Sequence, residues 1–196
     1  MIQYCLYFLA RILHIMKKMK NMKKSIIIVI AILIAGFSTK TMAQATANST
    51  AGVKMVTPIS ITETSALHFG TMAVLGGSLG TCVLSTQGAR TSTGGVNLSA
   101  QSPIATNAAY NVNGAVNTTY AITLPPTIVV SNGTPAQDMT INALLARTAS
   151  AGVNGLTGTL NGSGADSFTI GGTLNVAAAQ TAATYSGNFS VTVAYN

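Results

Sequence analysis

The stretch YSGNFSVTVAYN, residues 185–196, closes the chain and decides its fold class. Within it, Phe189, Val191, Val193 and Tyr195 alternate with small or polar residues. Successive side chains of a β-strand point to opposite faces of the sheet. The alternation therefore predicts a half-buried C-terminal strand, with these four side chains on the core face.

Strand-like segments separated by turn residues fill the chain before this closing stretch. They are rich in Val, Ile, Thr and Tyr, and clusters of Gly, Asn, Pro and Ser separate them. The expected strands cover residues 53–62, 67–72, 80–86, 96–100, 110–116, 119–124, 127–131, 139–147 and 167–176, with a loop over 150–164. Many short strands without a convincing helix predict an all-β fold, a β-sandwich forming a single domain over residues 46–196.

Two of these strands carry a second expectation. Pro58 lies inside the first one, and proline cannot donate a hydrogen bond to a neighbouring strand. That strand is therefore expected at a sheet edge, or broken at Pro58. Residues 139–147 also fit a helix, but Thr140, Ile141 and Asn142 suit a strand and favour that interpretation.

The N-terminal part has the order of a secretory signal peptide. Basic residues between 17 and 24 precede an apolar run over 25–37, and small residues at Ala43 and Ala45 offer two cleavage sites. The apolar run is shorter than the roughly 20 residues that span a bilayer. Residues 1–45 are therefore predicted to be a cleaved leader, leaving no membrane anchor.

Residues 1–16 fit neither a basic n-region nor a folded domain. Translation that starts at Met16, Met19 or Met22 would exclude most or all of them, and an unusually long leader is the alternative.

The formal net charge of +7 resides in the predicted leader. After residue 45, three cations face three carboxylates, so the net charge there is zero. These residues are Lys54, Arg90 and Arg147 against Glu63, Asp138 and Asp166. The basic character of the whole chain therefore gives no reason to expect a nucleic-acid partner.

Cys82 is the sole cysteine after residue 45, because Cys5 belongs to the predicted leader. An internal disulfide is excluded, and the fold must depend on its core. Cys82 lies in a strand-like run and is interpreted as a small buried hydrophobe, with a reactive thiol as the alternative.

Residues for acid–base or metal chemistry are scarce. His68 is the one histidine after residue 45, and it has no recognisable catalytic partner in the sequence. One histidine and one cysteine cannot supply a zinc site, and no phosphate-binding loop or nucleophile elbow is present. The sequence therefore predicts a protein that is not an enzyme and that has no catalytic residue, metal or cofactor.

Several motifs occur together along the chain. They are VTPISIT (56–62), LHFGT (67–71), GARTSTGGV (88–96), YAITLP (120–125), IGGTLNV (170–176) and TYSGNFSVTV (184–193). Their order resembles an uncharacterised family of bacterial exported domains, a domain of unknown function. That family is similar to the fimbrial subunits of archaic chaperone–usher pili and to spore-coat-U-type domains. The resemblance implies an immunoglobulin-like, fimbrial-type β-sandwich.

The resemblance to fimbrial subunits also implies an assembly mechanism, donor-strand complementation. A donor strand from one subunit would fill an apolar groove of the next, through Ala47, Ser49, Ala51, Val53 and Met55. The partners would be further copies or related subunits, a periplasmic chaperone and an outer-membrane usher. The alternative is that this segment is the first strand of a complete sandwich.

The expected function is therefore an exported structural subunit or surface protein of a pilus or of cell adhesion, located in the periplasm, on the cell surface or outside the cell. The alternative is a self-contained secreted module that binds a glycan or a surface protein. For a glycan site, Tyr110, Tyr120 and Tyr185 are the candidate aromatic side chains, although strand spacing also suits them to the core.

Overall fold

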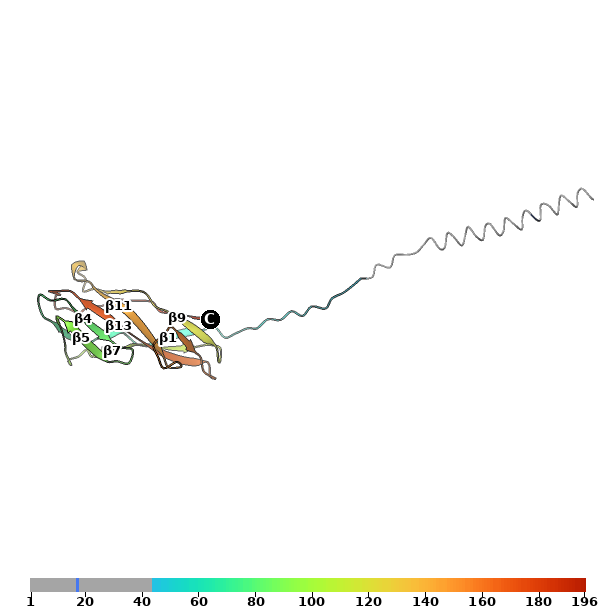
Figure 1. Ribbon diagram of the computed structural model, residues 1–196, viewed down its shortest axis with the longest axis horizontal. Helices are drawn as coiled ribbons and strands as arrows, with labels where there is room; N and C mark the ends of the chain where they lie inside the picture. The colour runs from blue at the N-terminus through green and yellow to red at the C-terminus, as the bar shows by residue number, and fades with distance from the viewer. Residues whose placement is uncertain (1–16, 18–43) are drawn as a thin grey trace, which may run out of the picture. The chain divides into compact units, whose positions relative to one another are not determined.

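The structure is a computed structural model that describes Lys17 and residues 44–196 (Figure 1). Residues 53–196 form one compact unit. Apart from Lys17, Gln44 and Ala45, the signal peptide predicted over 1–45 lies outside the described residues.

The prediction of an all-β fold with several antiparallel sheets is confirmed. The strands are β1 (Ser60–Ser65), β2 (His68–Phe69), β3 (Met72–Val74), β4 (Gly80–Leu84), β5 (Arg90–Gly94), β6 (Val96–Leu98), β7 (Ala105–Thr106), β8 (Ala108–Asn113), β9 (Thr119–Thr123), β10 (Ile128–Val130), β11 (Met139–Thr148), β12 (Thr157–Thr159), β13 (Ala165–Val176) and β14 (Thr192–Tyr195). Between residues 44 and 196 the one helical element is a 3-10 turn, η1 (Pro135–Gln137). The segment 139–147 is a strand, as its residue types favoured.

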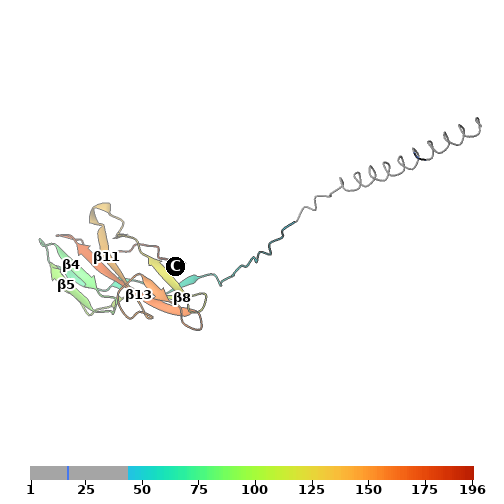
Figure 2. The same cartoon turned by 45° about the vertical axis from the view of Figure 1, so that its right-hand side comes forward.

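The long strand β13 lies at the centre of the largest sheet (Figure 2). One of its edges pairs with β11, and the other pairs first with β8 and then with β4. The sheet order is β1-β8-β13-β11-β10, with β5 attached through β4. Every pairing in this sheet is antiparallel, and the three neighbours of β13 are not consecutive with it in the chain, so crossover connections join them.

Glycines mark the point where β13 changes partners. Ile170 is the last β13 residue paired with β8, and Gly172 is the first paired with β4. A Cβ on Gly171, between them, would overlap the carbonyl oxygen of Leu84 and lie 2.7 Å from the carbonyl carbon of Ser85. The close approach of these two backbones therefore requires glycine at this position.

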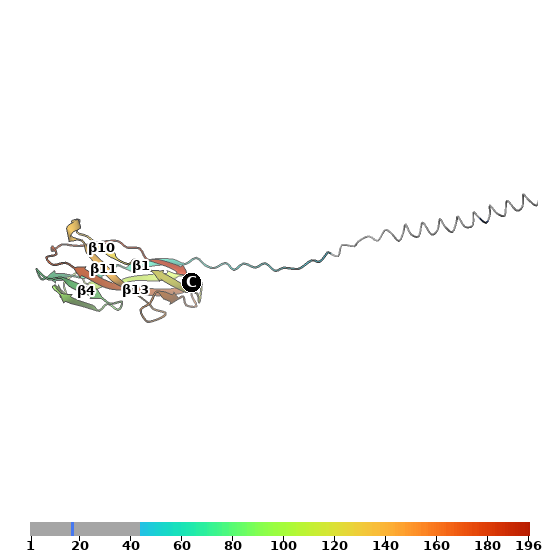
Figure 3. The same ribbon diagram turned by 45° about the horizontal axis from the view of Figure 1, so that its top comes forward.

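Smaller sheets cover the large one. One has the order β12-β9-β14, and two short ribbons pair β2 with β7 and β3 with β6. Buried side chains between the sheets form two adjoining clusters (Figure 3 shows the strands around them). The largest fully buried side chains include Tyr120, Leu84, Leu160, Phe168 and Ile170. Fully burying each such side chain contributes on the order of 1.5–3 kcal/mol.

Arg90 holds together loops that the sheets leave apart. Its Nη1 donates to the carbonyls of Phe69 (2.7 Å) and Thr71 (3.1 Å), and its Nη2 donates to that of Ser99 (2.5 Å). Three backbone carbonyls are thus satisfied by one half-buried guanidinium, whose planar fork suits several acceptors at once. This contact connects the β2–β3 region to the end of β6.

The structure differs from the expected elements in several places, and the strands β5 and β7 were not expected. The first strand begins at Ser60 and not at Val53, because no described strand pairs with residues before Pro58. The expected loop 150–164 contains β12, which pairs with β9. The C-terminal strand is hydrogen-bonded only over 192–195, since β9 is short, although the alternation of exposure extends back to Phe189.

Substituting Gly171→Ala is expected to destabilise the domain by about 1–3 kcal/mol, because the methyl group would push β4 away from β13. The matched control is Gly76→Ala, since a Cβ on Gly76 meets no atom within 4 Å. Urea unfolding of both variants measures the difference. Equal free energies of unfolding for the two variants would contradict the proposed role of Gly171.

Candidate functional site

Two strands on neighbouring sheets each have one unpaired edge. Within the described residues, β1 pairs only with β8, and β14 pairs only with β9. Figure 1 places the C-terminus beside β9 and β1. Such edges present free backbone N–H and C=O groups, which can pair with a further strand.

Tyr195 links the two edges at one end. Its hydroxyl donates to the carbonyl of Thr57 (2.6 Å), just before β1, and accepts from the N–H of Ala115 (2.6 Å). The end of β14 thus lies beside the start of β1, so the two strands run in opposite directions.

Half-buried apolar side chains lie along both strands and pack against the same buried cluster. On the β1 side they are Ile59, Ile61 and Leu67, and on the C-terminal side they are Phe189, Val191, Val193 and Tyr195. We call these seven residues the β1–β14 seam. The sequence predicted the C-terminal four as core residues, but their exposure is intermediate. The seam therefore presents partly exposed apolar side chains at the edges of two sheets.

A cavity of about 310 Å³ adjoins the seam at Leu67. Its apolar lining includes Phe69, Met72, Met139 and Tyr185. Phe69 and Met139 belong to the buried core, so the cavity extends from the seam into the interior. Methionine side chains adapt readily to differently shaped apolar groups. Sequence reasoning did not identify this cavity, because its lining comes from segments far apart along the chain.

The predicted donor residues are all exposed. Residues 44–58 have no secondary structure, and Ala47, Ser49 and Ala51 are exposed. The side chains of Val53 and Met55 are 89% and 90% exposed. They are the two most exposed of the large hydrophobic side chains in the described part of the chain.

The other residues considered in the sequence have structural surroundings. His68 is exposed, and its Nδ1 accepts from the N–H of Gly70 (2.8 Å). Cys82 is a free, fully buried thiol, and burial raises its pKa. Tyr110 and Tyr120 belong to the core, which removes both as exposed platforms for a sugar. Tyr185 is half-buried, and its hydroxyl donates to the carbonyl of Thr181 (2.8 Å).

The three carboxylates do not form a cluster. Glu63 and Asp138 are exposed, and Asp166 is half-buried. Among the described residues no group of three His, Cys, Asp or Glu side chains is placed to hold a metal ion. In the same part of the chain, no helix has the length and apolar character needed to cross a membrane.

Asp166 is instead saturated with hydrogen bonds. Its Oδ2 accepts from the hydroxyls of Tyr120 (2.9 Å) and Ser150 (2.6 Å), and its Oδ1 accepts from the N–H groups of Ser167 (2.8 Å) and Ser150 (3.2 Å). Burial raises the pKa of the Tyr120 hydroxyl well above its ordinary value, and the bond to Asp166 and that carboxylate's charge add to the effect. This arrangement ties β9 to β13.

Tyr120 makes the domain sensitive to alkaline pH. Its pKa in the folded state lies above that of the unfolded chain, about 10. Its contribution to stability is therefore complete below pH ~10 and falls above it by up to about 1.4 kcal/mol per pH unit. Urea unfolding at several alkaline pH values should show a shallower loss of stability for Tyr120→Phe than for the unaltered protein. Parallel pH profiles would contradict this assignment.

The domain-of-unknown-function model DUF4402 matches residues 59–195 of the chain, from the start of the β1–β14 seam to Tyr195. Comparison with curated proteins gives no match. Comparison with solved structures gives none either. Since the family model covers nearly all of the compact unit, this chain belongs to the DUF4402 family of domains of unknown function.

Proposed function

We propose that the protein is an exported, non-enzymatic structural subunit of fimbrial type, an immunoglobulin-like β-sandwich that lacks one strand. The β1–β14 seam is the observation that carries this proposal. It combines free edges on β1 and β14 with a floor of half-buried apolar side chains. A donor strand would satisfy the free backbone groups and cover the apolar floor in one step.

The exposed N-terminal segment has the length and composition of that donor. Residues 46–55 would extend about 34 Å at roughly 3.4 Å per residue. Small residues at 47, 49 and 51 suit a shallow groove, whereas Val53 and Met55 suit a deeper one. Covering each of these two side chains contributes about 1.5–3 kcal/mol.

The direction of the donor places its large side chains near the cavity. Every pairing between the described strands is antiparallel, and a donor that adds to β14 in the same way would run from Tyr195 towards Tyr185. Its C-terminal end, with Val53 and Met55, would then meet the cavity lined by Met72 and Met139.

The donor must come from another copy. Such a strand runs parallel to β1, because β1 and β14 run in opposite directions. A parallel connection needs about a dozen residues or more, whereas Met55 is separated from Ser60 by only four. The short connection therefore favours exchange between subunits, and it disfavours the first strand of a self-contained sandwich.

The implied partners are further copies or related subunits. A periplasmic chaperone would cover the seam before assembly. At an outer-membrane usher, the donor strand of another subunit would replace the chaperone. The resulting location is the cell surface.

Assembly is tested on the sheared cell-surface fraction, run on SDS gels with and without boiling. Strand-exchanged polymers should give a ladder that collapses on boiling to one band of the size left after leader removal. Deleting residues 46–55, or substituting Val193→Asp in the seam, should abolish the ladder because either change removes one half of the joint. Val153→Asp is the matched control, since Val153 is 60% exposed and lies outside the seam.

A single monomer band for the unaltered protein, boiled or not, would overturn the proposal. So would an intact ladder in the deletion variant. Either result would favour the self-contained binding module.

A further inference from the structure

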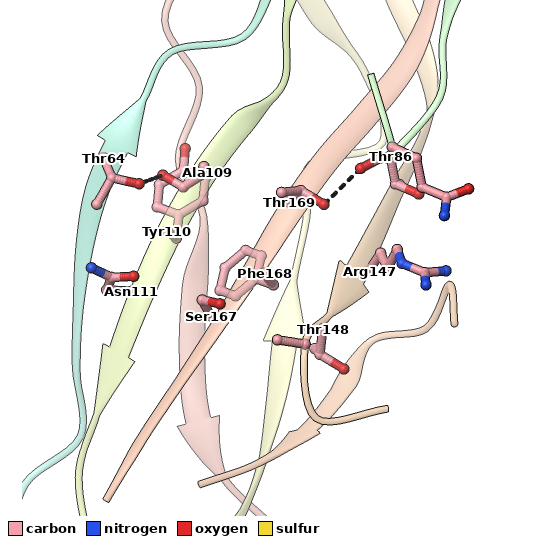
Figure 4. A pocket seen from close by; sticks show the side chains of 12 residues that line it. Thr64, Thr86, Ala109, Tyr110, Asn111, Arg147, Thr148, Ser167, Phe168 and Thr169 are labelled. Carbon is pink, nitrogen blue, oxygen red and sulfur yellow. Dashed lines mark hydrogen bonds between the residues drawn. The ribbon is translucent and has the colours of Figure 1, made fainter. Parts of the chain in front are cut away.

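A polar hollow lies on the large sheet, on the face opposite the core. Two adjoining depressions of about 370 and 530 Å³ share Asn111, Ala149 and Ser167, so they form one continuous hollow. Along β8 and β13 the buried side chains alternate with Ala109, Asn111, Ser167 and Thr169, which face outward. Figure 4 shows the first of the two depressions, with Thr64 and Asn111 on one side and Thr86 and Arg147 on the other.

Hydrogen bonds fix the rim of this hollow. The hydroxyl of Thr169 donates to the carbonyl of Thr86 (2.8 Å), and the hydroxyl of Thr86 donates to the Oδ1 of Asn154 (2.7 Å). The first bond, drawn in Figure 4, attaches the β4–β5 turn to β13, and the second attaches it to the loop after β11. A rim held in this way is preorganised, which lowers the entropic cost of binding.

Other polar side chains in the hollow are free to bind. Gln87, Asn111 and Ser167 line it, and their side chains form no hydrogen bond with another residue of the described part of the chain. Amides and hydroxyls of this kind both donate and accept hydrogen bonds. They match the hydroxyl groups of a sugar.

Arg147 is the one cation among the residues that line the hollow. Its backbone is fixed by pairing with Thr169 of β13 and by a bridge to Asn154. The guanidinium of Arg90 donates hydrogen bonds to three carbonyls. The guanidinium of Arg147 forms no hydrogen bond or ion pair within residues 44–196. Asp166, in the second depression, is held by its own four donors. The hollow therefore holds one cation, Arg147, and one carboxylate, Asp166, that do not pair with each other. A half-buried guanidinium that forms no ion pair, set among sugar-compatible groups, is complementary to the carboxylate of a ligand.

We propose that this hollow binds an acidic polysaccharide through a uronate residue. The guanidinium of Arg147 would bind the sugar carboxylate, and Gln87, Asn111 and Ser167 would bind sugar hydroxyls. A peptide strand is disfavoured, because β8 and β13 are paired along both edges and offer no free backbone. A nucleic acid would require several cations, and the hollow has one.

Calorimetric titration of the exported chain with galacturonate oligomers tests the proposal. We expect binding to the acid form and none to its methyl ester, which removes the carboxylate charge. Arg147→Gln should weaken binding by about tenfold or more, and Arg147→Lys should restore it only in part because the forked contact is lost. Lys54→Gln removes the same charge from an exposed site elsewhere and should bind like the unaltered chain. Thermal melts establish that each variant is folded.

Three results would overturn the proposal: no binding of the acid form, equal binding by folded Arg147→Gln, or equal binding of the methyl ester. Polyglutamate is a further probe, and binding as tight as that of the uronate would replace the sugar with a peptide carboxylate. The variant lacking residues 46–55 should bind unchanged, because the hollow lies outside the seam. Failure of subunit assembly and failure of sugar binding are therefore distinguished.

Discussion

The shared use of strand β13 by two sets of strands is the constraint on which the rest of the structure depends. Its first half holds β8 and through it β1, and its second half holds β4 and β5, while β11 follows the opposite edge. The change of partner requires backbones to approach so closely at Gly171 that no side chain fits. Both buried clusters take residues from this strand, Phe168 and Ile170 in one and Leu174 and Val176 in the other.

The β1–β14 seam combines two strand edges with half-buried apolar side chains. The strand β1 is one edge of the large sheet and β14 is one edge of the small sheet, and half-buried apolar side chains lie along both. In the proposed assembly, a strand from a neighbouring subunit would add to the stability of the domain, and its folding would be coupled to assembly. The polar hollow lies on a different face, so assembly and ligand binding do not compete for the same surface.

The fold class followed from period-two alternation, and residues 189–195 show why this signal works. Burial of alternate side chains is a local property, so the sequence reveals it. The strand β12 was missed because Thr157–Thr159 has a glycine at its centre and takes its strand conformation from β9. The donor residues were proposed from the resemblance to fimbrial subunits, whereas the seam, the cavity and the free guanidinium of Arg147 depend on which segments meet in space. No local sequence pattern predicts these contacts between distant segments.

Arg90 has a consequence for how the domain matures. Small exported domains often join their loops with disulfides, yet the compact unit contains a single thiol, and Cys82 is fully buried. The guanidinium of Arg90, hydrogen-bonded to the carbonyls of Phe69, Thr71 and Ser99, joins these loops without a covalent bond. Folding of residues 53–196 therefore needs no oxidant and no disulfide isomerase, and it proceeds equally in reducing and oxidising surroundings.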